Sequence, residues 1–276
     1  RDAVALQVGG RSPYQFLLAD GARGERIDPA GGRYVAYYDR HQRPFSVADE
    51  LGRSTLLAHD GRGRVREYTY PEGDKESFAY DDRNNPTTFT RTPKPGSPLA
   101  PLVITAQWNS TWNKPDWIRD AMHTGSDPHQ TDFVYFASGN GKSLLQTATR
   151  PAPVGTTPRP VYAFTYNAFG QVLDATDPTG LIIRSTYHAT NGNRLTSILN
   201  PTPGINATTT FTYDANGDVL SVSDPRSNVT EMTYDNNRRP LITKHHNGNI
   251  AAALLAAERT SYDVLGRVTS TDGGTV

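Results

Sequence analysis

The chain has 276 residues, with 28 Lys+Arg balanced by 28 Asp+Glu and no Cys. A formal charge of zero argues against a nucleic-acid binder, because such proteins usually carry a basic excess. No apolar run approaches the 18 residues or so that a membrane span needs, and the longest, residues 250–257, is interpreted as a short helix. The lack of Cys excludes disulfides and thiolate metal sites. With 24 Gly and 20 Pro, the composition favours a turn-rich β protein.

A Tyr-Asp pair recurs along the chain. Four intervals, 38 to 59, 59 to 80, 166 to 187 and 213 to 234, measure 21 residues. The clear copies begin, in chain order, at Tyr38-Asp39, His59-Asp60, Tyr80-Asp81, Tyr166-Asn167, Tyr187-His188, Tyr213-Asp214, Tyr234-Asp235 and Tyr262-Asp263. Weaker copies are expected at Ala19-Asp20, Trp108-Asn109 and Tyr135-Phe136, which makes about eleven repeats.

Each copy predicts a tight hairpin turn. Asp or Asn is followed three residues later by Gly, a pattern typical of a type I turn with a left-handed residue after it. The pattern is clearest at Asp60 to Gly63, Asn167 to Gly170, Asp214 to Gly217 and Asp263 to Gly266. Asn84 and Asn191 stand where that Gly is missing, and Asn also tolerates positive φ. Gln42 and Arg238 break the rule, so their turns are expected to be longer or differently shaped.

A second turn signal follows eight to ten residues later in the form Asp-Pro-x-Gly. It is complete at Asp28 to Gly31 and at Asp177 to Gly180, and partial at Asp49, Asn200 and Asp224. Short runs rich in β-branched residues lie between the two kinds of turn and predict antiparallel hairpins. A lone hairpin is marginal, so we expect an all-β fold in which successive hairpins pair into one curved, spiralling sheet. The Tyr that precedes each turn is expected to stack on its neighbours.

Two stretches depart from this pattern, and both are interpreted as insertions between repeats. Residues 93–130 begin with a Pro-rich segment, and residues 151–160 form a Pro-rich loop. The first stretch contains Trp108, Trp112 and Trp117. Three indoles so close together are expected either to pack in the core or to form a contact platform for a ligand.

The segment from Tyr213 to Pro225, followed by Tyr234-Asp235, resembles the YD repeats of the Rhs family. Related repeats occur in the TcB and TcC components of Tc toxins and in teneurins. The resemblance implies a β-sheet strip that spirals into a hollow shell and, in the bacterial toxins, encloses a toxic domain. No segment here matches the family's self-cleaving core. Residues 1–276 are therefore expected to be a single stretch of shell wall, within a longer polypeptide or assembly.

The residues expected to maintain the repeat are structural. They are Tyr38, Asp39, Tyr80, Asp81, Tyr166, Gly170, Tyr213, Asp214, Gly217, Tyr234, Asp235, Tyr262, Asp263 and Gly266. Asp214-x-Asn216-x-Asp218 resembles the start of a calcium loop, but Pro225 stands where the loop's Glu belongs. The pair His245-His246 is interpreted as an exposed turn, not as metal ligands. We expect no metal, no cofactor, no catalytic residue and no enzymatic activity.

Two classes of function remain open. The favoured one is a non-catalytic shell segment of an Rhs- or Tc-type toxin, secreted or at the cell surface. Its partners would be the remainder of the shell and an encapsulated toxin domain. The alternative is a cell-surface or secreted module that recognises glycan or protein through the tryptophans. A β-propeller with two repeats per blade is a rival architecture, and the irregular spacing disfavours it.

Overall fold

The computed structural model describes residues 2–6, 14–19, 22–122, 129–153, 158–200 and 205–275, and for residues 2–6, 14–19 and 275 it describes the backbone alone. The chain divides into two compact units. Unit 1 comprises Arg1–Asp132 and Arg150–Pro153, and unit 2 comprises Phe133–Thr149 and Val154–Val276. Throughout these described ranges the secondary structure is strand and turn, without a helix. The all-β prediction is therefore confirmed.

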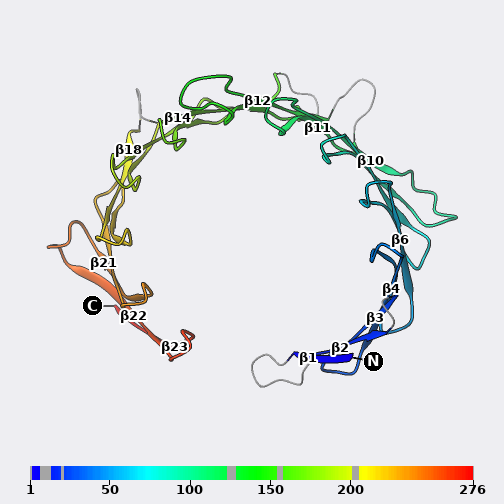
Figure 1. Ribbon diagram of the computed structural model, residues 1–276. Coiled ribbons are helices and arrows are strands. Elements are labelled where there is room, and N and C mark those ends of the chain that lie inside the picture. The colour runs from blue at the N-terminus through cyan, green and yellow to red at the C-terminus, as the bar shows by residue number, and fades with distance from the viewer. Residues whose placement is uncertain are drawn as a thin grey trace. The chain divides into compact units, whose positions relative to one another are not determined.

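The strands of unit 1 follow one another in a meander, each antiparallel to the next. Figure 1 shows them as one curved strip within the unit. They are β1 (Asp2–Leu6), β2 (Tyr14–Ala19), β3 (Arg23–Ile27), β4 (Arg33–Tyr38), β5 (Pro44–Ala48), β6 (Ser54–His59), β7 (Val65–Thr69), β8 (Lys75–Tyr80), β9 (Pro86–Thr92), β10 (Leu102–Trp108), β11 (Pro115–Arg119) and the first half of β12 (Gln130–Tyr135).

Unit 2 repeats the same antiparallel meander. Its strip also curves in Figure 1. Its strands, after the second half of β12, are β13 (Leu145–Thr149), β14 (Val161–Tyr166), β15 (Val172–Thr176), β16 (Ile182–Tyr187), β17 (Arg194–Leu199), β18 (Ala207–Tyr213), β19 (Val219–Ser223), β20 (Val229–Tyr234), β21 (Pro240–His246), β22 (Leu254–Tyr262) and β23 (Val268–Thr275).

The repeat tyrosine marks a break in register within each hairpin. In β8, for example, Ala79 pairs with Thr88, whereas Tyr80 pairs with Pro86, so one residue of β9 is left over. The same shift occurs at Tyr166, Tyr213 and Tyr234. An extra residue in one strand of an antiparallel pair is a β-bulge, which bends the strand and increases its twist.

Side chains alternate between two faces of each strip because the strand period is two. We call the face that carries the repeat tyrosines the tyrosine face; on β8 it bears Glu76, Phe78 and Tyr80. Lys75 and Ser77 lie on the opposite face. Paired residues share a face, so Tyr68 and Phe89 join the tyrosine face of unit 1 through their pairing with Glu76 and Phe78.

Neither unit has a second layer, so the described chain has almost no buried core. Val229, 8% exposed, is the one buried hydrophobic residue among the described residues, and no large side chain in these ranges is fully buried. Many strand hydrophobics remain open, such as Leu56 and Ile183. Main-chain hydrogen bonds between strands, together with contacts between neighbouring side chains on one face, therefore hold the strip together.

Two sequence expectations about local structure are wrong. The apolar run 250–257 is not a helix: residues 249–252 turn, closed by the Ala252 N–H to Asn249 carbonyl bond of 2.8 Å, and Leu254 begins β22. The pair His245-His246 is not an exposed turn but the end of β21, and His246 is only 7% exposed. In both places, pairing with the adjacent strand overrides the local propensity.

The stretch 93–130 contributes two strands to the sheet. β10 pairs with β9, and β11 pairs with β10 and β12; the register of β10 with β11 shifts between Gln107 and Trp108, as it does at a repeat tyrosine. Its Pro-rich start, residues 93–101, precedes these strands, and Pro95 packs against the turn at Gly73. Residues 123–128 of this stretch and residues 154–157 of the loop 151–160 lie outside the described residues.

Candidate functional site

Most turns of the Tyr-Asp repeat share one geometry, well shown by the turn from Asp60 to Arg64. The Asp60 N–H donates to the carbonyl of Arg64 (2.8 Å), and the Gly63 N–H donates to the carbonyl of Asp60 (3.0 Å). One carboxylate oxygen, Asp60 Oδ1, accepts the N–H groups of Arg62 (2.9 Å) and Arg64 (3.0 Å). Gly63 has φ of 83°, the left-handed region that the sequence pattern predicts. The repeat Asp is therefore a turn cap.

Residues other than Gly fill the left-handed position without changing the turn. Gln42 (φ 61°) and Arg238 (φ 63°) close turns of the same length and bonding, so the expectation of a different shape is wrong. Asn84 (φ 70°) confirms the substitution of Gly by Asn. Asn191 does not take this role, because the turn at His188 is one residue longer and places Gly192 at φ of 73°.

The Asp-Pro-x-Gly turns have the same hydrogen bonds. In the turn from Asp28, Oδ1 accepts the N–H groups of Ala30 and Gly32 (both 2.9 Å), and Gly31 has φ of 89°. The turns of each strip thus lie in two rows, one at each end of its strands, which we call the YD end and the Asp-Pro end. At the YD end the strands are joined by the turns that begin at Asp39, Asp60, Asp81, Asn109, Asn167, His188, Asp214, Asp235 and Asp263. At the Asp-Pro end they are joined by the turns that begin at Asp28, Asp49, Tyr70, Asp177 and Asp224.

Successive turns at the YD end are linked by the side chain four residues after the Asp. Arg64 binds Asp60 Oδ2 through Nε (2.6 Å) and reaches the next turn with Nη1, at the carbonyl of Asp81 (3.1 Å) and Asn84 Oδ1 (2.9 Å). Asn85 similarly donates to Asp81 Oδ2 (2.9 Å) and to Asn113 Oδ1 (2.6 Å). The side chain that caps one turn therefore also fastens the next.

The repeat tyrosine makes a second link. Its hydroxyl donates to the main-chain carbonyl of the first residue after the preceding turn, over 2.8 to 2.9 Å. These pairs are Tyr80 with Val65, Tyr166 with Leu145, Tyr187 with Val172, Tyr213 with Arg194, Tyr234 with Val219 and Tyr262 with Pro240. A Tyr at this position thus supplies both a ring and a donor.

The predicted stacking of one repeat tyrosine on the next is wrong. Of the ring contacts among the described residues, none joins two repeat tyrosines. Instead, the guanidinium of Arg64 lies 4.5 Å from the ring centre of Tyr80, and Arg239 lies 4.5 Å from that of Tyr262. The Arg that caps one turn thus covers the tyrosine of the next repeat, a cation–π contact.

The three tryptophans do not form one platform. Trp108 takes the place of a repeat tyrosine, and its Nε1–H donates to the carbonyl of Pro86 (2.8 Å), the position that a tyrosine hydroxyl would reach. Trp117 pairs with Gln107, one residue before Trp108, and so lies on the opposite face, where its Nε1–H donates to Gln107 Oε1 (2.9 Å). Trp112 lies in the turn between them. Trp108 therefore belongs to the repeat.

Three of the turn carboxylates, those of Asp39, Asp81 and Asp235, are held in their ionised form by hydrogen bonds within the turn. Hydrogen bonds from the side chain of Arg43 and from backbone N–H groups lower the pKa of Asp39 far below its usual range. The Arg239 side chain lowers the pKa of Asp235, and the Asn85 side chain lowers that of Asp81. A carboxyl group with a lowered pKa has no proton to donate near neutral pH, so these groups are poor general acids and serve as hydrogen-bond acceptors.

The candidate metal ligands are also engaged elsewhere. Asp214 caps its own turn, and Asp218 makes a two-pronged ion pair with Arg238 (2.7 to 3.1 Å). His245 pairs with Thr230, and His246 pairs with Val229, which lie on opposite faces of β20. The described part of the chain brings together no cluster of three metal-ligating side chains and contains no helix long and apolar enough to cross a bilayer.

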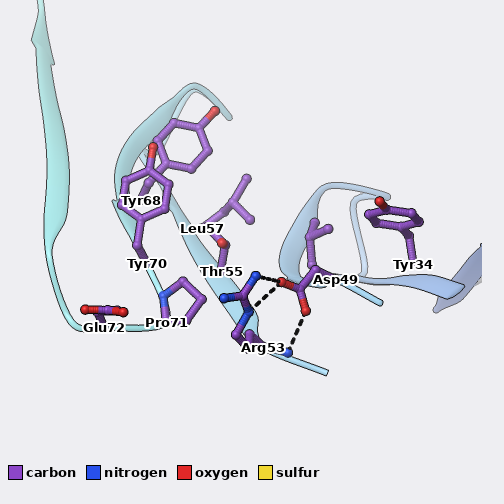
Figure 2. A pocket seen from close by; sticks show the side chains of 10 residues that line it. Tyr34, Asp49, Arg53, Thr55, Leu57, Tyr68, Tyr70, Pro71 and Glu72 are labelled. Atoms are coloured by element: carbon purple, nitrogen blue, oxygen red, sulfur yellow. Dashed lines mark hydrogen bonds and ion pairs between the residues drawn. The ribbon is translucent and has the colours of Figure 1, made fainter. Parts of the chain in front are cut away.

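One hollow lies on the tyrosine face at the Asp-Pro end of unit 1, and sequence reasoning missed it. It measures about 530 Å³ and is lined by Tyr34, Val47, Asp49, Arg53, Thr55, Leu57, Tyr68, Tyr70, Pro71 and Glu72. Figure 2 shows Tyr68 and Tyr70 on one side, Tyr34 on the other, and the Asp49–Arg53 ion pair between them. These residues come from β4 to β7 and from the turns at Asp49 and Tyr70. No short motif unites them, so the sequence gives no signal for the hollow.

Comparison with known proteins agrees with this geometry. Residues 213–250 match the family model of the RHS repeat. The resemblance to Rhs repeats is confirmed. No curated protein matches the chain in sequence.

Solved Tc-toxin structures share the fold. The chain superposes on the crystal structure of TcdB2-TccC3-Cdc42 with a TM-score of 0.65 and 15% identity, over 96% of this chain and 15% of that one. For TcdB2-TccC3 without its hypervariable C-terminal region the TM-score is 0.64, with 15% identity, over 95% and 15% of the two chains. For the Photorhabdus luminescens Tc holotoxin pore it is 0.62, with 16% identity, over 96% and 15%. The chain thus spans about 15% of the length of these solved chains.

Proposed function

We propose that the chain is a non-catalytic wall segment of an Rhs- or Tc-type toxin shell, and that the shell encloses a polypeptide cargo. The observation that carries the proposal is the single-layer strip of linked hairpins. A domain that acted alone would cover one face of such a sheet, because exposed apolar strand residues are a liability. A wall needs no second layer, since its stiffness comes from the hydrogen-bonded sheet and from the links between its turns.

The mechanism proposed is confinement. The strip supplies an inextensible hydrogen-bonded surface, and its turns hold successive hairpins at a fixed spacing. The Asp residues that begin the turns at both ends use their carboxylates to cap those turns, which supports a role without acid–base chemistry. The partners would be further repeats of the same shell and the enclosed segment, and the complete toxin would act after secretion or delivery.

Limited proteolysis of the complete natural polypeptide tests this proposal. We expect a segment beyond the repeats to stay protected while the shell is intact, and to be digested once guanidinium opens the shell. A polypeptide in which every segment outside the repeats is cleaved at the same rate with and without guanidinium would contradict confinement. A membrane anchor or sorting signal beyond the repeats, in place of a small variable domain, would favour the alternative of a surface binding module.

A further inference from the structure

Four Asn-Gly pairs occur in the chain, and all of them lie in unit 2, in connections between strands. They are Asn140-Gly141, Asn191-Gly192, Asn216-Gly217 and Asn247-Gly248. Because glycine has no side chain, its main-chain nitrogen can approach the carboxamide of the asparagine before it. Attack of that nitrogen on the carboxamide carbon closes a five-membered imide and expels ammonia. The glycine N–H must be free for this step, so its hydrogen bond decides how readily each pair reacts.

Three of the four glycine N–H groups are hydrogen-bonded within unit 2. Two of them donate to a main-chain carbonyl of their own turn, and the third donates to a side-chain oxygen. The bonds run from Gly192 to the His188 carbonyl (3.0 Å), from Gly217 to the Asp214 carbonyl (3.1 Å) and from Gly248 to Asn228 Oδ1 (3.3 Å). Each bond must open before the nitrogen can attack, so the folded chain protects these three pairs.

The Gly141 N–H has no acceptor among the described residues, because its turn is an enlarged and uncapped form of the YD turn. Phe136 stands where a YD turn has Asp. Its N–H donates to the carbonyl of Leu144 (3.0 Å), and its carbonyl accepts the N–H of Ser143 (2.9 Å), which has φ of 67°. The same two bonds close the turn at Asp60, but four residues earlier. Phenylalanine offers no carboxylate to the added N–H groups, so that of Gly141 is left to water.

The two residues of this pair differ in exposure. Asn140 is exposed, so water reaches its carboxamide. Gly141 is buried against two rings: a Cβ there would lie 2.7 Å from Phe136 Cδ2 and 3.0 Å from Tyr166 Cδ2. The packing therefore requires glycine at position 141, which is also the residue that hinders the attack least.

We propose that Asn140 is the site at which the folded chain converts spontaneously to aspartate and isoaspartate. The Gly141 nitrogen gives its proton to solvent and bonds to Asn140 Cγ, while the bond from Cγ to Nδ2 breaks and the amide leaves as ammonia. Water, the only co-reactant, then adds to one of the two imide carbonyls and opens the ring. Isoaspartate carries the main chain through its side chain, and the added atom moves Gly141 off the rings of Phe136 and Tyr166. The inference does not depend on the proposed shell function.

Peptide mapping by mass spectrometry tests the site in the intact chain. The chain is kept in warm, mildly alkaline buffer, once folded and once in urea that unfolds it. In the folded chain we expect Asn140 to deamidate faster than each of the other three asparagines by about fivefold or more, the factor that one net hydrogen bond is worth. In urea the four should react at similar rates, because no glycine N–H is then bound. Labelling with protein isoaspartate methyltransferase should mark the Asn140 peptide.

Asn228→Ala is the matched variant, because it removes the acceptor of the Gly248 N–H and leaves the turn at Asn140 unchanged. Deamidation of Asn247 in the folded chain should then rise by the same factor, while the rate at Asn140 stays as it was. The proposal is overturned if Asn140 reacts no faster than the other three in the folded chain, if the same ranking persists in urea, or if Asn228→Ala leaves the rate at Asn247 unchanged.

Discussion

The YD end and the Asp-Pro end of each strip use the same turn but differ in what lies beside it. At the YD end, a Cβ placed on the left-handed Gly would meet the preceding turn's side chain: Arg43 at 3.4 Å from Gly63, or Arg239 at 3.3 Å from Gly266. At the Asp-Pro end, the corresponding position at Gly180 has nothing within 4 Å. Identical local geometry therefore serves two purposes, a closely linked row of turns at one end and more loosely linked turns at the other.

The difference arises from the residue four places after the Asp. Arg64, at the YD end, binds its own Asp60 and the next turn, whereas all hydrogen bonds of Arg53, at the Asp-Pro end, go to its own Asp49. The Asp-Pro end is not without links, because the Gly248 N–H reaches Asn228 Oδ1 at 3.3 Å. Denser cross-linking at the YD end would let a strip flex at the other end while the spacing of its hairpins stays fixed.

The largest effect should come from acid, because it acts on the turns at both ends at once. The pKa values of Asp39 and Asp235 at the YD end, and of Asp49 and Asp177 at the Asp-Pro end, are lower in the folded chain than the unfolded value of about 3.9. The stability that these ionised carboxylates give to the folded chain is fully present above the unfolded pKa, and it is lost as pH falls through the pKa of each group in the folded chain. Urea midpoints from pH 7 to pH 2 should hold down to about pH 4 and then fall. A midpoint that is flat below pH 4 would contradict the capping role.

Substitution of the left-handed glycines should separate the two ends. Gly180→Ala should cost about 1 kcal/mol, because an L residue at positive φ is strained and nothing else is near. Gly192→Ala should cost roughly 1 kcal/mol more, because its Cβ would displace Gln171, which donates to the carbonyl of Gly192 (2.7 Å). Urea unfolding measures both, and equal costs would show that the contact with the preceding turn is immaterial.

Removal of the linking side chain should give a difference of similar size. Arg64→Ala loses the ion pair with Asp60, the two bonds to the next turn and the contact with Tyr80, and should cost about 1.5 kcal/mol. Arg53→Ala loses only the exposed ion pair with Asp49 and should cost about 0.5 kcal/mol. Thermal or urea unfolding compares them, and an Arg53→Ala cost equal to that of Arg64→Ala would remove the asymmetry.

The smallest effect is the loss of one hydroxyl. Tyr234→Phe deletes the bond to the Val219 carbonyl (2.9 Å) and should cost about 1 kcal/mol. The control is Tyr68, which lies on the same face but has no such bond among the described residues. Tyr68→Phe should change stability by less than about 0.5 kcal/mol. If both variants unfold at the same urea concentration, the hydroxyl link adds nothing.

Much of the fold could be predicted from spacing, because Asp, Pro and Gly fix local turn geometry. The turns at Asp60 and Asp28 are examples. The links between turns could not be predicted, since they join residues about 20 apart whose pairing depends on the sheet. Trp108 shows this limit: its sequence position marks a weak repeat, and only the bond to Pro86 shows that an indole replaces the tyrosine hydroxyl. The hollow at Tyr34 and Tyr70 requires the register of four strands.

Native-state hydrogen exchange tests the central claim most directly. The Gly63 N–H at the YD end and the Gly52 N–H at the Asp-Pro end donate to equivalent turn carbonyls, at 3.0 and 2.9 Å. Their local geometry is the same, so a difference in exchange reports how freely each turn opens. We predict that Gly63, and with it Gly170 and Gly266, exchanges at least tenfold more slowly than Gly52 and Gly180. Equal protection at the two ends would contradict the account.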